Sequence, residues 1–266
     1  MNNNKTIGLV LSGGGMKGAA HLGVIKALGE NNIFPSMISG SSVGAIVGAL
    51  YAANFKAEEI LEFFKINKTV FRWRHFSRSR PGFLNAERYD EIFESWLDHH
   101  TFETLSKKLF ICVTDVLNGK FQFFSQGELV KPILASAAVP GVFSPVEIED
   151  NWYIDGGTMN NFPVEALIGQ CDFVIGSLAS PNKPIPKSAI SNSMRLINRA
   201  TELTFHSSTL AKLHQCDHVF APQDLYNYGI FDSKKIDEMF QVGYDHATQH
   251  MESLIQKLFE QQRQII

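Results

Sequence analysis

Ser42 is the first residue whose type and setting suit it for chemistry. It stands at the centre of Gly40-Ser41-Ser42-Val43-Gly44, which fits the pattern G-x-S-x-G. That pattern is typical of a nucleophile elbow, a sharp strand-to-helix turn whose small neighbours leave the serine oxygen clear of the sheet. The flanking residues predict this context, because a short strand at 37–39 precedes the turn and a very apolar helix at 43–53 follows it. The alternative interpretation is that Ser41 or Ser42 only caps the helix.

A second candidate is the glycine-rich string Gly13-Gly14-Gly15-Met16-Lys17-Gly18, between an apolar strand at 6–11 and a helix at 16–29. Glycine amides can turn toward a ligand, and a helix N-terminus adds partial positive charge, so the string suits an anion. A dinucleotide site would need an acidic residue at the end of the second strand, where Ser39-Gly40-Ser41 stands. A P-loop would need Lys-Ser/Thr, where Gly18 is followed by Ala19-Ala20. An oxyanion hole and a purely structural turn remain.

The third candidate is Asp155-Gly156-Gly157, directly after a strand at 152–154. A serine nucleophile needs a base, and in a mainly parallel sheet the strand ends line the functional crevice. Alone, the tripeptide is more typical of a turn, and it gains weight only from the other two motifs. An aspartate is a weak base in water, but a dry site would raise its pKa and strengthen it.

Histidine is the usual alternative base for a serine nucleophile. The histidines after Asp155 lie in or beside predicted long helices, with no glycine-rich loop to present them: His206, His214, His218, His246 and His250. His21 lies on the first helix, behind the glycine string. We interpret all of them as surface or core residues, which leaves a Ser42–Asp155 dyad.

The elements that must position these residues alternate between strand and helix. With short connections, this order predicts a mainly parallel sheet with right-handed crossovers. We expect further strands at 109–115, 121–124, 152–154, 173–178 and 218–221, with a hairpin turn at Asn118-Gly119. We expect further helices at 86–98, 127–138, 191–214 and 233–258. The prediction is one α/β domain over residues 1–266, with the motifs within 6–180 and a helical C-terminal part at 188–266.

The composition excludes several classes of protein. With 44% apolar and 19% charged residues, the chain of 266 residues is not disordered, and a net charge of −3 argues against nucleic acid as a partner. Three isolated cysteines predict neither a disulfide framework nor a zinc site, and suit a reducing compartment such as the cytoplasm. We expect no calcium loop, metal or cofactor, and we see no secretory signal, lipidation motif or membrane-spanning run.

The segment 63–83 is basic and aromatic and holds no acidic residue. Its charged and aromatic members are Lys65, Lys68, Arg72, Arg74, Arg78 and Arg80, with Phe63, Phe64, Phe71, Trp73, Phe76 and Phe83. Such side chains suit a lipid headgroup interface, where each basic residue contributes about 1 kcal/mol. We therefore predict peripheral membrane contact through Phe63–Phe83; stacking on single-stranded RNA would use similar residues. The alternative is a solvated loop whose aromatic rings pack on the core. Whether the segment is a lid stays open.

Taken together, the motifs resemble the patatin-like phospholipase family. The G-G-G-x-K-G string, the G-S-S-V-G elbow, Ala135-Ser136-Ala137-Ala138-Val139-Pro140 and the D-G-G tripeptide match its order and spacing over about residues 6–180, as in short bacterial members. The resemblance implies a three-layer α/β/α fold with a mainly parallel central sheet, and acyl-ester hydrolysis, often of phospholipids. The part from Ser188 onward resembles such members more loosely.

The resemblance also implies roles for individual residues. Ser42 is the expected nucleophile and Asp155 the expected proton acceptor, while amides of Gly13, Gly14 and Gly15 form the oxyanion hole. Lys17 matches a basic residue of the glycine-rich block, with a supporting electrostatic role or none beyond a solvated helix start. Ser12 stands where plant members often have aspartate. The remaining motif glycines are Gly18, Gly40, Gly44, Gly156 and Gly157.

The function that we predict from the sequence is a serine acyl hydrolase acting on phospholipid or lysophospholipid esters. An esterase or thioesterase for smaller acyl groups would share the same dyad, so the sequence does not separate it. A non-catalytic regulator with the patatin fold is the alternative from another class. Against it, both residues of the dyad and all three glycines of the expected oxyanion hole are present.

Overall fold

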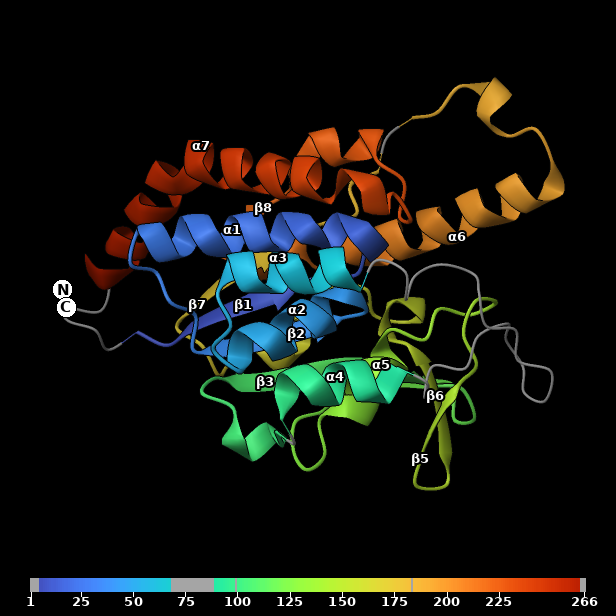
Figure 1. Cartoon of the computed structure of the whole chain (residues 1–266). Helices are drawn as coiled ribbons and strands as arrows, with labels where there is room; N and C mark the ends of the chain where they lie inside the picture. Colours follow the sequence, from blue (N-terminus) through green and yellow to red (C-terminus); the bar gives the residue numbers. More distant parts are fainter. Residues whose placement is uncertain (1–4, 68–88, 99, 183, 264–266) are drawn as a thin grey trace.

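The computed structural model describes residues 5–67, 89–98, 100–182 and 184–263. Its centre is an eight-stranded sheet in the order β5-β6-β3-β2-β1-β7-β8, with β4 also paired to β3 (Figure 1). The strands are β1 (Ile7–Leu11), β2 (Met37–Ser41), β3 (Lys108–Asp115), β4 (Lys120–Phe124), β5 (Val146–Ile148), β6 (Asn151–Asp155), β7 (Phe173–Ser177) and β8 (His218–Phe220). The helices are α1 (Ala19–Glu30), α2 (Val43–Ala52), α3 (Ala57–Ile66), α4 (Asp90–Leu97), α5 (Val130–Ser136), α6 (Ser193–Leu210) and α7 (Ile236–Arg263).

The sheet is mainly parallel, as the alternation of strands and helices predicts. Strands β3, β2, β1, β7 and β8 run parallel to one another. β4, β5 and β6 pair antiparallel. The hairpin turn predicted at Asn118-Gly119 joins β3 to β4, and Gly119 has the positive φ of 63° that such a turn favours in glycine.

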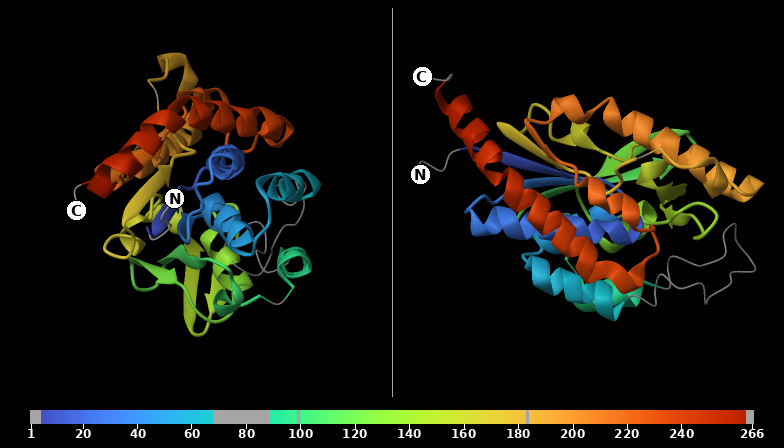
Figure 2. Two further views of the ribbon diagram at one scale, coloured as in Figure 1. Left: turned by 90° about the vertical axis from the view of Figure 1, so that its left-hand side faces the viewer. Right: turned by 90° about the horizontal axis from the view of Figure 1, so that it is seen from above.

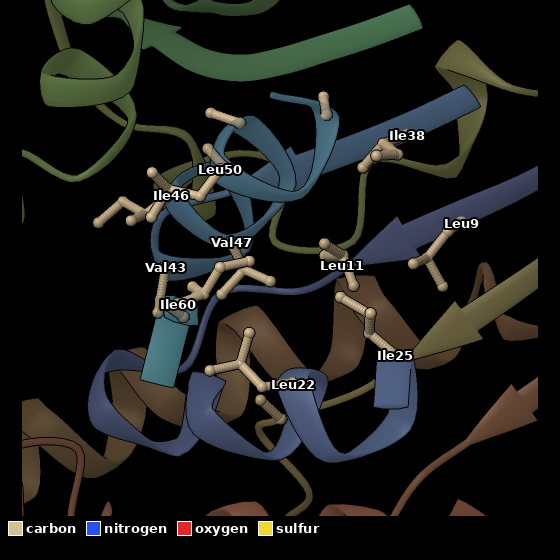
Figure 3. Close-up of a cluster of buried hydrophobic side chains, with 14 of the residues drawn as sticks. Leu9, Leu11, Leu22, Ile25, Ile38, Val43, Ile46, Val47, Leu50 and Ile60 are labelled. Atoms are coloured by element: carbon tan, nitrogen blue, oxygen red, sulfur yellow. The ribbon is translucent and has the colours of Figure 1, made fainter. Parts of the chain in front are cut away.

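Helices cover both sides of this sheet, which confirms the predicted three-layer arrangement. Viewed from above, the strands lie between α1 and α7 on one side and α6 on the other (Figure 2). Side chains alternate along β1, so Leu9 and Leu11 join the larger core beneath the first side while Val10 joins a smaller cluster on the second. Figure 3 shows the larger core, where Leu22 of α1 and Val47 of α2 meet the leucines of β1.

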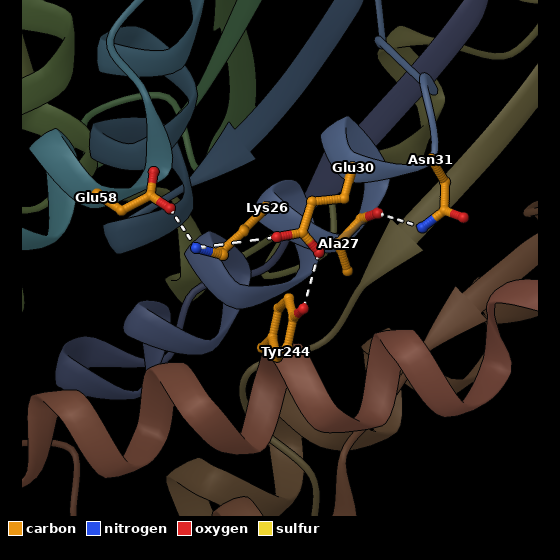
Figure 4. Close-up of polar contacts among 6 residues, drawn as sticks. All are labelled: Lys26, Ala27, Glu30, Asn31, Glu58 and Tyr244. Atoms are coloured by element: carbon orange, nitrogen blue, oxygen red, sulfur yellow. Dashed lines mark hydrogen bonds and ion pairs between the residues drawn. The ribbon is translucent and has the colours of Figure 1, made fainter.

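Helices α1 and α7 pack unusually closely, because glycines lie where they cross. A Cβ atom on Gly23 would overlap the Phe240 carbonyl oxygen, and one on Gly243 would overlap the Ala20 carbonyl oxygen. Polar contacts at the rim of this crossing (Figure 4) include the Tyr244 hydroxyl, which donates to Glu30 at 2.8 Å. Exposed polar contacts of this kind contribute about 1 kcal/mol or less, so the backbone-to-backbone packing determines how α7 docks.

The start of the segment 63–83, residues 63–67, differs from the sequence-based expectation. Its first residues belong to α3, in which Phe63 and Phe64 are buried in the core, so the interpretation of these two rings as a lipid-facing surface is wrong. Lys65 is paired with Glu62 and Asp237. The amphipathic pattern of α3 is hard to recognise in the sequence because its aromatic residues run directly into the basic segment. Residues 68–83 lie outside the described part of the chain.

Smaller differences concern the ends of elements. Strand β5 has three residues and was not predicted, because so short a run carries no periodicity. The helix expected at 191–214 ends at Leu210 and is followed by a separate turn at 213–215. Across the described ranges, no helix combines the length and apolar character that crossing a membrane requires.

Gly243→Ala is expected to lower the free energy of unfolding by about 1–3 kcal/mol, because the new methyl group forces α7 away from α1. The matched control is Gly29→Ala, where a Cβ would meet its nearest atom, on Phe34, at 3.8 Å. This control should be neutral or raise stability by up to about 1 kcal/mol. Urea unfolding followed by circular dichroism measures both changes, and equal stability of the two variants would contradict the packing argument.

Candidate active site

Ser42 occupies a strained turn between β2 and α2. Its φ of 55° and ψ of −127° lie in a region that non-glycine residues rarely adopt, at a cost of about 1–3 kcal/mol. The turn closes because its flanking glycines have no side chain: a Cβ on Gly40 would overlap the Gly44 carbonyl oxygen, and one on Gly44 would overlap that of Leu11. This is the strand–turn–helix geometry that the G-x-S-x-G pattern predicts.

Ser42 and Asp155 are in direct contact. The Ser42 hydroxyl donates a hydrogen bond of 2.6 Å to Oδ2 of Asp155. The other carboxylate oxygen, Oδ1, accepts 2.7 Å from the amide of Gly157, which orients the group. Asp155 is 6% exposed, and this burial raises its pKa to about 6, against the lowering effect of the two hydrogen bonds. The carboxylate is therefore ionised at neutral pH and is a stronger base than an aspartate in water.

The pair meets because β2 and β6 share one edge of β3. β4 occupies the other edge of β3 over residues 111–115. On the shared edge, β2 runs parallel to β3 as far as the pair Ser41–Cys112, and β6 runs antiparallel from the pair Asp155–Val113. The two strands thus end head to head at adjacent positions of β3. Asp155 lies at the end of a strand, as expected, but this strand, β6, runs antiparallel to its neighbour β3.

Ser136 links the turn to the rest of the sheet, a role that the sequence did not reveal. It is fully buried at the end of α5, where its hydroxyl accepts 2.9 Å from the Ser42 amide and donates 2.6 Å to the Cys112 carbonyl. Two residues on, the Ala138 carbonyl accepts from the amide of Asp155 at 3.0 Å. The Ala135–Pro140 segment thus holds the backbone of both residues of the pair. The sequence pointed to this segment only as one of the motifs that resemble the family, without a role for any residue in it.

The glycine string lies against Ser42. A Cβ on Gly13 would stand 3.1 Å from the Cβ of Ser42. The Gly13 amide donates 3.2 Å to the Asn161 carbonyl, whereas the amides of Gly14 and Gly15 have no acceptor among the described residues. Gly15 also has a φ of 58°. The string therefore lies against Ser42 through Gly13, and the two residues that follow carry amides without an acceptor among the described residues.

Three other motif glycines allow close approach around the pair. A Cβ on Gly18 would press into the side chain of Val43, and one on Gly156 would overlap the Cys112 carbonyl oxygen. A Cβ on Gly157 would stand 2.9 Å from Oδ1 of Asp155. Lys17 is half-buried in the turn Gly15–Gly18, and its electrostatic role stays a prediction.

The histidines of the described ranges make none of the hydrogen bonds of this pair. His21 is fully buried, which lowers its pKa to about 4, and it bonds to Ser12 and Ser177. His218 lies on β8, at the far edge of the sheet. In the same part of the chain, no cluster of three or more His, Cys, Asp or Glu side chains is arranged to hold a metal ion.

Residues 9–168 match the sequence model of a family described as patatin-like phospholipase. An uncharacterized NTE family protein of Mycobacterium tuberculosis is 32% identical over 215 residues, which cover 78% of this chain and 59% of that protein. Lysophospholipase NTE1 of Coccidioides immitis is 28% identical over 284 residues, covering 94% of this chain and 18% of that protein. The chain thus spans about three fifths and one fifth of the length of these relatives.

Solved structures share the fold at low sequence identity. VipD from Legionella pneumophila aligns with a TM-score of 0.60 and 17% identity, covering 94% of this chain and 67% of that one. Human GIVD cytosolic phospholipase A2, in complex with methyl gamma-linolenyl fluorophosphonate, aligns with a TM-score of 0.54 and 10% identity, covering 97% and 59%. At this identity the likeness concerns the fold alone.

Asp155→Asn is expected to make stability less dependent on pH. Because burial raises the pKa of Asp155 from 3.8 to about 6, the folded wild type binds this proton more tightly than the unfolded chain does. That stabilisation is present below pH 4 and is lost as the pH rises through 6, a difference on the order of 2–3 kcal/mol. Asparagine has no proton to lose, and its amide oxygen can still accept from Gly157.

The variant should therefore gain stability relative to the wild type between pH 4 and pH 7, as measured by denaturant unfolding at each pH. Asp150→Asn, an exposed carboxylate in the turn between β5 and β6, is the matched control and should show no such trend. A difference between Asp155→Asn and the wild type that stays constant with pH would count against a desolvated carboxylate.

Proposed function

Because the chain belongs to the patatin-like phospholipase family, we propose that it is a serine acyl hydrolase that cleaves acyl ester bonds of phospholipids or lysophospholipids. The observation that carries this proposal is the hydrogen bond of 2.6 Å from the Ser42 hydroxyl to the buried carboxylate of Asp155. It joins a serine in a strained turn to a group with the properties of a base. The lysophospholipase name of the Coccidioides relative supports a lipid ester as the substrate.

In the proposed reaction, Ser42 Oγ attacks the acyl carbon while its proton passes to Oδ2 of Asp155. The negative charge that develops on the carbonyl oxygen is stabilised by glycine-string amides. Those of Gly14 and Gly15 suit this role better than that of Gly13, whose hydrogen already bonds to Asn161. The loss of one such donor typically reduces the rate by about 10²–10³.

Collapse of this intermediate breaks the ester bond, and Asp155 returns the proton to the leaving alcohol. The acyl group is then attached to Ser42. In the second half, Asp155 takes a proton from the water that attacks the acyl–enzyme. Asp155 then returns this proton to Ser42 Oγ as the fatty acid leaves. A pKa of about 6 suits both directions of proton transfer near neutral pH.

Contact with a lipid surface is the second part of the proposal. The loop before α7 is attached to the glycine string, since the Ile230 carbonyl accepts 2.8 Å from the Met16 amide. The side chains of Ile230 and Phe231 are 43% and 48% exposed there, and Met159, shortly after Asp155, is 41% exposed. Exposed apolar side chains on segments that adjoin the candidate site suit insertion at the membrane interface.

Ser42→Ala and Asp155→Asn test the chemistry. With p-nitrophenyl esters of graded chain length and a fluorogenic phospholipid, in EDTA, Ser42→Ala is expected to lose at least about 10³-fold in kcat/KM. Asp155→Asn should lose about 10²–10⁴-fold, the range of a general base. Wild-type kcat/KM should also fall as the pH drops below about 6, because Asp155 then becomes protonated.

Ser95→Ala, an exposed serine on α4, is the control and should keep full activity. If the wild type prefers short acyl chains, the substrate is a smaller acyl ester and not a phospholipid. Folded wild type without turnover on any of these esters would favour a non-catalytic regulator. Asp155→Asn with most of its activity intact would remove Asp155 as the base.

Phe231→Ser tests the lipid contact. Binding to vesicles of phosphatidylcholine and phosphatidylglycerol should weaken by about 10- to 100-fold, because burial of one Phe side chain contributes roughly 1.5–3 kcal/mol. Phe259→Ser is the matched control: this ring is 49% exposed near the C-terminal end of α7, and its removal should leave vesicle sedimentation unchanged. Equal vesicle binding by the two variants would place the lipid contact elsewhere.

A further inference from the structure

The peptide bond between Gly13 and Gly14 is held from one side by two hydroxyl groups. The Gly13 carbonyl accepts 2.7 Å from the Ser180 hydroxyl and 3.0 Å from that of Ser12. The described residues contain no cis peptide bond, and in a trans peptide the N–H points opposite to the C=O. The two hydroxyls therefore determine the direction of the Gly14 N–H.

The order of the strands indicates that this direction is toward Ser42. β1, which leads into the glycine string, lies between β2 and β7 in the sheet. Ser42 follows β2, and Ser180 follows β7. A Gly13 carbonyl that points to the β7 side directs the Gly14 N–H to the β2 side. There it has no acceptor within the described residues, and the backbone of Gly13 already lies against Ser42.

The preceding peptide, between Ser12 and Gly13, is held as well. The Ser12 carbonyl lies 2.9 Å from Nε2 of His21, and the Gly13 amide donates to Asn161. Because a carbonyl only accepts, Nε2 of His21 carries the hydrogen, and Nδ1 accepts 2.7 Å from the Ser177 hydroxyl. The string thus reaches Gly14 with little freedom to turn. A donor held in this way stabilises an oxyanion without reorganising during the reaction.

We propose that Ser180 is a positioning residue of the oxyanion hole, whose hydroxyl holds the Gly13 carbonyl so that the Gly14 N–H points at the developing oxyanion. The inference rests on the function proposed above. Of the two hydroxyls, that of Ser12 is fully buried and also accepts 2.9 Å from the Ala179 amide, so its removal would disturb the loop itself. Ser180 is half-buried, which makes it the cleaner residue to change.

Ser180→Ala is expected to lower kcat and kcat/KM for a p-nitrophenyl ester equally, by about tenfold, with KM within about twofold. An interaction made only in the transition state gives this pattern. Ser180→Thr keeps a hydroxyl and should recover most of the loss. Ser106→Ala is the matched control, since it removes a similar bond, 2.7 Å from hydroxyl to the Ala52 carbonyl, near the start of β3. It should leave the kinetics unchanged.

Rates on a thiono ester distinguish a role in the oxyanion hole from a purely structural role of Ser180, because a structural defect would slow both kinds of ester equally. Sulfur accepts hydrogen bonds weakly, so Ser180→Ala should lose clearly less rate on the thiono ester than on the oxygen ester. Equal losses on both esters, a raised KM with unchanged kcat, or unaffected kinetics would overturn this inference alone. Wild type without Ser42-dependent turnover would overturn the proposed function and this inference with it.

Discussion

Two strands that end head to head on one edge of β3 are the constraint on which the candidate site depends. β2 ends beside Cys112 and β6 begins its pairing beside Val113, so the residue after β2 and the last residue of β6 meet. A slip of β6 by one residue would turn Asp155 to the other face of the sheet, because side chains alternate along a strand. The buried hydroxyl of Ser136 and the carbonyl of Ala138 support this register, because they accept hydrogen bonds from the amides of Ser42 and Asp155.

The site stores free energy that the rest of the molecule must supply. Ser42 adopts a backbone conformation that costs about 1–3 kcal/mol. Asp155 is also buried, and its raised pKa means that keeping it ionised at neutral pH costs folding free energy. The apolar core between the sheet and helices α1, α2 and α3 offsets these terms, as does the docking of α7 on α1. The strained backbone lies at the position where the Ser42 hydroxyl reaches the carboxylate of Asp155.

Much of the fold could be predicted, because the signals are local. The apolar strand before the glycine string, the helix after Ser42 and the hairpin at Asn118-Gly119 follow from runs of side chains and from turn residues. The sequence was misleading where the helical pattern of α3 overlaps the start of the basic, aromatic segment. Phe63 and Phe64 were counted with a basic, aromatic segment, although they form the buried stripe of α3. Composition alone does not show which way a ring faces.

The identities of the candidate groups were determined by the sequence itself: a serine in a turn that only small neighbours permit, a carboxylate before two glycines, and a glycine string before a helix. Their spacing also points to the family. Which groups touch was decided by tertiary structure. The antiparallel entry of β6, the support from Ser136 and the hold of Ser180 on the Gly13 carbonyl join residues far apart along the chain. Such contacts depend on strand order and register, which arise from the packing of the whole sheet and leave no periodic trace in any one segment.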